Sequence, residues 1–188
     1  SIVVQNPYAR LVNIGLFPML VIGLIGPEAF TVVFGPEWAE AGLYTQILIP
    51  WQLVTFLGSP ISTLVSVLEC QGWGLLFNIV LLVTRVASLV IGGWSGDPRL
   101  ALAFYSISGF VLWLGMVAWL LRASGASILR AGLDTARGLS YSTPTLLALA
   151  IAKWWWHWAA WSILLIAGIG GLVHYGIILR HDRTLLEP

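Results

Sequence analysis

Long apolar runs constrain this chain more than any other feature. Four of them, at about 11–34, 43–68, 73–93 and 100–121, exceed the roughly 20 residues that a helix needs to cross a bilayer. Only 9% of the 188 residues are charged, whereas soluble domains carry about 25%. In lipid each segment must satisfy its own backbone hydrogen bonds, which a helix does. The sequence therefore predicts an all-α, polytopic transmembrane helical bundle.

Two further apolar runs, at about 143–157 and 160–179, bring the prediction to about six spans arranged as three hairpins. Residues 1–121 then hold four spans, 122–142 form a basic cytoplasmic connection, and 143–188 hold the last two spans and a short basic tail. In the connection, Ile128, Leu129 and Leu133 lie opposite Arg130, Asp134 and Arg137 on a helix. This pattern is typical of a short amphipathic helix on the membrane surface.

Two helix breakers subdivide the predicted spans. Pro27 and Glu28 are expected to end the first span, which leaves 29–34 as a short apolar turn at the surface. The stretch 94–98, WSGDP, has the composition of a turn between the third and fourth spans.

The charges orient the bundle. With the N-terminus of the chain in the cytoplasm, six arginines fall on the cytoplasmic side, namely Arg10, Arg122, Arg130, Arg137, Arg180 and Arg183. Only Arg99 and Lys153 fall outside, in agreement with the positive-inside rule. Five tryptophans gather at the outer turn between the last two spans, where an aromatic belt belongs, namely Trp154, Trp155, Trp156, Trp158 and Trp161.

Several functional classes find no support in the residues. The net charge is +1, which gives no footprint for a nucleic-acid partner. The single cysteine, Cys70, excludes an internal disulfide. No metal-ligand spacing, Ser/His/Asp set or phosphate loop is found, so we expect neither a cofactor nor an enzyme. The partners expected from composition are membrane lipids and, because the chain begins at Ser1, the rest of a longer protein.

Arg85 is the sharpest candidate for a functional residue. It lies near the middle of the third span, where a guanidinium costs about 2.5–3.5 kcal/mol on insertion scales. Asn78 and Ser88, seven residues earlier and three later, share its helix face. This face predicts an anion site that meets phosphate or carboxylate groups. The alternative is a buried arginine satisfied by helix-end carbonyls or by a carboxylate from a missing part of the protein.

The second span carries a polar stripe and two prolines. The stripe follows one helix face and comprises Gln52, Thr55, Ser59, Ser62 and Ser66. It predicts either the wall of a hydrophilic path or a tightly packed helix interface. Pro50 and Pro60 predict a hinge, although proline is also frequent in membrane helices generally. Glu28 is a weaker candidate, either a proton carrier or a structural carboxylate.

Three segments of the chain carry a further pattern, namely Phe34–Tyr44 (FGPEWAEAGLY), Gln46–Trp51 (QILIPW) and Ser59–Leu64 (SPISTL). Together they resemble the polysaccharide-export flippases. These flippases are the O-antigen and capsule translocases of the multidrug/oligosaccharidyl-lipid/polysaccharide exporter superfamily. The resemblance is carried by an FG-x-x-W-x-x-AG turn followed by a helix with proline and then Ser-Pro.

The resemblance implies a specific fold and activity. Members of this family have two helical lobes around a cationic cavity, in the inner membrane of bacteria. They move undecaprenyl-pyrophosphate-linked oligosaccharide from the inner to the outer leaflet by alternating access. On this interpretation the chain is most of the second lobe, its missing partner is the N-terminal lobe, and Arg85 belongs to the cavity.

Two alternatives to the flippase remain. A drug/cation antiporter of the same superfamily would need carboxylates in the membrane, and none is found at mid-span. A non-catalytic component, or an embedded enzyme, of cell-envelope polysaccharide synthesis would carry a charged or histidine cluster at one leaflet. No such cluster is present in the sequence. The residues therefore favour transport of a lipid-linked glycan.

Overall fold

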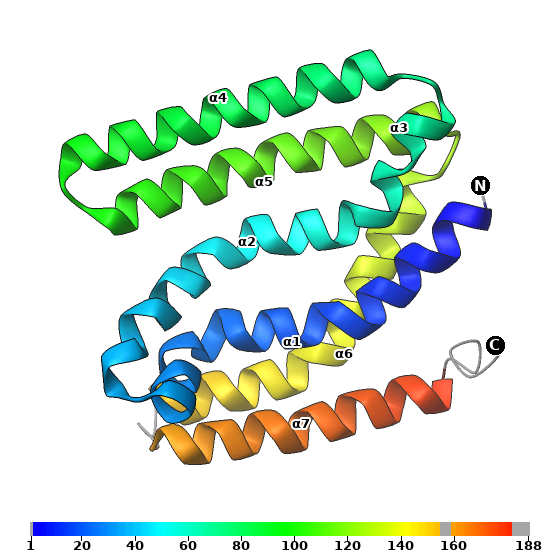
Figure 1. Ribbon diagram of the computed structural model, residues 1–188. Helices are drawn as coiled ribbons and strands as arrows, with labels where there is room; N and C mark the ends of the chain where they lie inside the picture. Colours follow the sequence, from blue (N-terminus) through cyan, green and yellow to red (C-terminus); the bar gives the residue numbers. More distant parts are fainter. Residues whose placement is uncertain (1, 155–158, 182–188) are drawn as a thin grey trace. The chain divides into compact units, whose positions relative to one another are not determined.

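The computed structural model describes residues 2–154 and 159–181, and within them every regular element is a helix (Figure 1). The elements are α1 (Ile2–Phe34), a 3₁₀ turn η1 (Pro36–Trp38), α2 (Ala39–Ser62), α3 (Leu64–Val67), α4 (Gln71–Ser95), α5 (Pro98–Ala123), α6 (Ile128–Trp154) and α7 (Ala160–His181). The all-α prediction is confirmed.

Among the described residues, five segments are long and apolar enough to cross a membrane. They are Leu11–Phe34, Pro36–Val67, Gln71–Ser95, Pro98–Ala123 and Ala160–Arg180. Together they make this a multi-pass membrane protein, as the apolar runs predict. The predicted span at 143–157 forms the second half of α6, which is not among the five. Its last three residues lie outside the described part of the chain.

The chain divides into two compact units. The first comprises Ser1–Ala9 and Ile47–Gly132, and the second comprises Arg10–Gln46 and Leu133–Pro188. Three helices, α1, α2 and α6, therefore contribute one part to each unit.

In the first unit, α4 and α5 form an antiparallel hairpin (Figure 1). A Cβ at Gly92 of α4 would overlap Ala101 of α5, so glycine allows the two backbones to touch there. Gly96 ends α4 in the left-handed region at φ 70°, and Asp97 caps α5 by accepting a 2.8 Å hydrogen bond from the Arg99 backbone N–H. The turn predicted at 94–98 is thus confirmed, although it is confined to Gly96 and Asp97, and it depends on the two residue types that cap helices best.

In the second unit, α1 packs against α6 and α7. The buried core joins residues of all three helices, namely Phe17, Val21, Ile25, Leu149, Ile163 and Ala167. Gly138 of α6 lies where a Cβ would come 2.6 Å from Val12 of α1. This core includes Ile25, the residue at which α1 is not helical.

Helix α1 breaks two residues earlier than the sequence predicts. Ile25 has non-helical dihedrals (φ −118°, ψ 23°), and 29–34 is helical, so the prediction of a turn there is wrong. Pro27 lacks the N–H that would bind the carbonyl oxygen of residue 23, and its ring crowds the preceding turn. The distortion therefore falls before the proline, which itself fits the first turn of the resumed helix.

The helices at the second and fifth predicted spans also begin or end at residues other than those predicted. Helix α2 ends at Ser62, and a turn at Thr63 leads into the short α3, so Ser66 does not continue the stripe along one straight helix. The hydroxyls of Ser62 and Thr63 donate to the carbonyls of Ser59 and Pro60, each at 2.7 Å. Residues 128–154, expected as a surface helix followed by a span, form one continuous helix, α6.

Candidate functional site

Arg85 lies on the face of α4 that turns toward α2 and α5. Its guanidinium carbon is 4.9 Å from the ring centroid of Trp51 on α2 and 5.2 Å from that of Tyr105 on α5. The two rings meet edge to face, with centroids 5.1 Å apart at 90°. Around this position α4 also exposes aliphatic side chains, as expected of a surface in lipid, namely Leu82, Val83, Val86 and Leu89. Arg85, Trp51 and Tyr105 are hereafter called the aromatic clamp.

A glycine makes room for the aromatic clamp. A Cβ at Gly109 would come 2.6 Å from Cδ1 of Trp51. Tyr105 and Gly109 are four residues apart and share a face of α5. This face therefore carries both the ring that contacts Arg85 and the gap that admits the indole of Trp51.

The aromatic clamp leaves several polar groups without a partner. Within the described residues, no hydrogen-bond acceptor reaches Nε of Arg85 or Nε1 of Trp51, although both atoms are buried. The hydroxyls of Thr55 and Ser106 are also buried and have no hydrogen-bond partner among the described residues. Buried polar groups are nearly always paired, and arginine and indole N–H groups can only donate. The Nε–H of Arg85 and the Nε1–H of Trp51 therefore lack acceptors, as expected of a site for an anionic or hydroxyl-rich ligand.

A cavity of about 290 Å³ lies in the same unit, and seven residues of α2 to α5 line it: Ser62, Val65, Gly74, Phe77, Asn78, Trp113 and Met116. Asn78 and Arg85 are seven residues apart on α4, which is about 10 Å along the helix. The amide of Asn78 donates to the carbonyl of Gly74 at 2.8 Å, and Nε1 of Trp113 is buried and unpartnered. The cavity thus adds polar surface two helical turns from the aromatic clamp.

The other predicted site residues occupy different environments. Ser88 is buried and donates to the carbonyl of Thr84 at 2.7 Å, with the hydroxyl of Ser108 at 3.4 Å. Gln52 and Ser59 are exposed on α2, so only Thr55 of the predicted stripe adds a buried, unpartnered hydroxyl. Pro50 and Pro60 both lie inside α2. Pro50 removes the N–H that would bind the carbonyl oxygen of Gln46, the last residue of the second unit in α2.

Sequence reasoning missed Trp51 and Tyr105. Both aromatic residues fall inside apolar runs, away from the run ends where tryptophan and tyrosine usually mark the membrane surface. That position was a usable signal. It did not identify the partner of Arg85, because it gives no information on which helices face each other.

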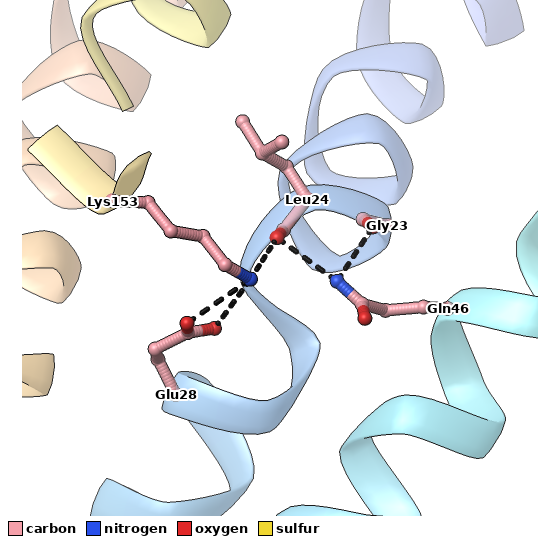
Figure 2. A network of polar contacts seen from close by, with 5 residues as sticks. All are labelled: Gly23, Leu24, Glu28, Gln46 and Lys153. Atoms are coloured by element: carbon pink, nitrogen blue, oxygen red, sulfur yellow. Dashed lines mark hydrogen bonds and ion pairs between the residues drawn. The ribbon is translucent and has the colours of Figure 1, made fainter. Parts of the chain in front are cut away.

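The second unit contains a separate polar network at the break in α1, shown in Figure 2. Nζ of Lys153 on α6 is 2.8 Å from the carbonyl oxygen of Leu24 and 3.0 Å from each carboxylate oxygen of Glu28. The side-chain amide of Gln46 on α2 donates to the carbonyls of Gly23 and Leu24, both at 2.9 Å. The sequence singled out Glu28 but placed Lys153 on the outer side with no partner.

Comparisons with known proteins add no relative. No protein-family model matches the chain, and no curated protein or solved structure matches it.

Proposed function

We propose that this chain is the second-lobe part of a flippase in the bacterial inner membrane. The flippase translocates undecaprenyl-pyrophosphate-linked oligosaccharide from the inner to the outer leaflet by alternating access, and the N-terminus of the chain is cytoplasmic. The missing N-terminal lobe completes the translocation path. The observation that carries this proposal is the aromatic clamp, an arginine inside a membrane-spanning helix without a carboxylate partner among the described residues.

The clamp suits a ligand with phosphate groups for an electrostatic reason. Contact with two aromatic rings offsets part of the cost of placing the guanidinium of Arg85 in the membrane, by about 0.5–2 kcal/mol for a cation–π contact. The positive charge is not neutralised by that contact. A pyrophosphate would neutralise it and accept charge-assisted hydrogen bonds, which are roughly twice as strong as neutral ones.

The groups around the clamp suit the glycan part of the same cargo. In this proposal Asn78, Gln52, Thr55, Ser59 and Ser88 line the polar path, and the unpartnered N–H of Trp51 adds a donor for sugar hydroxyls. Pro50 and Pro60 are the bending points of α2. The segments FGPEWAEAGLY, QILIPW and SPISTL support the same family assignment.

A drug/cation antiporter is less well supported. Its cationic cargo needs a free carboxylate within the membrane. Glu28 lies inside the span Leu11–Phe34, but its carboxylate is paired with Lys153. A non-catalytic role in polysaccharide synthesis finds no specific observation in its favour.

The decisive experiment replaces Arg85 in cells that lack the chromosomal copy of the gene. We expect Arg85→Leu to abolish export and to let lipid-linked glycan accumulate on the cytoplasmic side, at normal protein abundance in the membrane. Arg85→Lys keeps the charge but loses the planar fork and the stacking, so we expect it to restore export only in part.

Arg122→Leu is the matched control, because Arg122 lies exposed in the last turn of α5. It should export normally. Full export by Arg85→Leu, or normal export in the deletion strain, would contradict the proposal.

A further inference from the structure

Three oxygen atoms surround the ammonium group of Lys153. They are the carbonyl oxygen of Leu24 at 2.8 Å and the two carboxylate oxygens of Glu28 at 3.0 Å (Figure 2). The side chains of Lys153 and Glu28 are only 18% and 21% exposed. An ammonium is a compact cation that only donates hydrogen bonds. Lys153 therefore occupies a position lined by oxygen atoms that can bind a cation.

The break in α1 supplies the backbone oxygens of this position. Pro27 has no N–H to offer the carbonyl of Gly23, and the non-helical Ile25 interrupts the helix directly after Leu24. Both carbonyls accept from side chains of other helices. Carbonyl oxygens released at a broken membrane helix are the groups with which transporters coordinate small monovalent cations.

Two glycines bring a further potential ligand to the break. Gly26 of α1 and Gly42 of α2 lie against each other, and a Cβ at Gly26 would come 2.5 Å from the carbonyl oxygen of Gly42. Gln46 is one turn beyond Gly42 on the same face of α2, which places its amide at 2.9 Å from both carbonyls. Rotation of that amide by half a turn would present its oxygen in place of its nitrogen.

We propose that these oxygens form a binding site for a small monovalent cation, and that the ammonium of Lys153 is its exchangeable occupant. The exchange keeps the site neutral, because Glu28 faces one positive charge before and after it. Lys153 is the penultimate residue of α6, and its flexible four-carbon stem lets the released ammonium reach water at the helix end. The proposal concerns a different site from the aromatic clamp and does not depend on the flippase function.

Chemical labelling of the lysine tests the exchange directly. Lys153 is the only lysine in the sequence, and peptide mass spectrometry can follow its acylation in the purified full-length protein. We expect labelling to be several-fold faster in NaCl or KCl than in choline chloride at the same pH and ionic strength, because choline is too large to displace the ammonium. Matching the ionic strength removes differences in screening. Equal rates in all three salts would overturn the proposal.

Glu28→Gln tests whether the salt effect arises at this site. Without the carboxylate, we expect fast labelling of Lys153 in all three salts, with no advantage for Na⁺ or K⁺. Glu37→Gln is the matched control, because Glu37 is exposed on η1, and it should retain the wild-type salt dependence. A salt effect that survives in Glu28→Gln would place the cation elsewhere and refute the proposal.

A second variant asks whether the vacated position holds a free cation. Lys153→Ala removes the tethered ammonium, so Na⁺ or K⁺ should raise its midpoint of thermal unfolding by several degrees relative to choline, since a ligand that binds only the folded state stabilises it. The double variant Glu28→Gln/Lys153→Ala should lose this response. An identical midpoint in the three salts for a folded Lys153→Ala protein would count against the site, and the labelling experiment decides if that variant does not fold. Neither readout involves transport, so failure here leaves the proposed flippase function untouched.

Discussion

Two partly buried cations of this protein, Arg85 and Lys153, are stabilised in opposite ways. Arg85 in the first unit contacts two aromatic rings, whereas Lys153 in the second unit contacts a carboxylate and a backbone carbonyl. Aromatic rings attract a cation without cancelling its charge, while a carboxylate cancels it. The charge of Arg85 is therefore still available to an anionic ligand, and that of Lys153 is already used inside the protein.

The largest effect on the free energy of unfolding is expected for variants of the Glu28–Lys153 pair. Glu28→Gln or Lys153→Met alone leaves one charge without its partner, which costs about 3–5 kcal/mol in a fully buried pair. Because both side chains are partly exposed, we expect about 2–3 kcal/mol for each variant. Thermal or denaturant unfolding in detergent measures this loss.

The double variant Glu28→Gln/Lys153→Met should recover part of the loss, because neither charge is then unpaired. Arg85→Met is the matched variant at the aromatic clamp and should cost less than either single variant, since no carboxylate is left behind. Equal losses at Arg85 and Lys153 would contradict the distinction between the two cations.

Effects of similar or smaller size are expected at the glycines that shape each site. Gly42→Ala would push a Cβ into the backbone of Gly26 and Pro27, which cannot move aside, so we expect a loss of about 2–3 kcal/mol in the free energy of unfolding. For Gly109→Ala the three atoms nearest to the added Cβ all belong to the side chain of Trp51, so this variant should cost about 1 kcal/mol. Its main effect should be on export, because the indole must move away from Arg85.

Gly168→Ala and Gly115→Ala serve as controls, because a Cβ at either position meets no atom within 4 Å. Both should leave unfolding and export close to wild type. A Gly109→Ala protein with a displaced Trp51 and normal export would show that the aromatic clamp is not needed for function.

The smallest expected effect is the direct coupling between Arg85 and Tyr105. A double-mutant cycle with Arg85→Met and Tyr105→Leu should give about 0.5–1 kcal/mol in the free energy of unfolding. A coupling near zero would mean that the ring of Tyr105 does not stabilise the guanidinium.

Much of the fold was predictable, because its signals are local. Apolar runs of about 20 residues identify spans without knowledge of their neighbours, and the pair Gly96–Asp97 marks a turn through its own dihedral and capping preferences. The break in α1 was predicted in the correct region but two residues late, since proline distorts the turn before it. In residues 128–154 the charges of Arg130, Asp134 and Arg137 suggested a boundary that the backbone does not have.

The two polar sites were only half predictable. Arg85 and Glu28 stand out in the sequence because ionisable groups are rare inside apolar runs. The partners of these two residues do not stand out. Lys153 is 125 residues away from Glu28, and Trp51 and Tyr105 look like ordinary aromatic residues of the core.

The sequence by itself determined that this is an all-α, multi-pass membrane protein and that one arginine lies within a span. Tertiary structure alone decided what surrounds each charge. The physical reason is that hydrophobic periodicity specifies which face of a helix is apolar, whereas the contact between two helices depends on how closely they approach and how each is rotated. At Gly26 and Gly42, and again at Gly109, the missing side chains permit the approach that brings Gln46 to the break in α1 and Trp51 to Arg85.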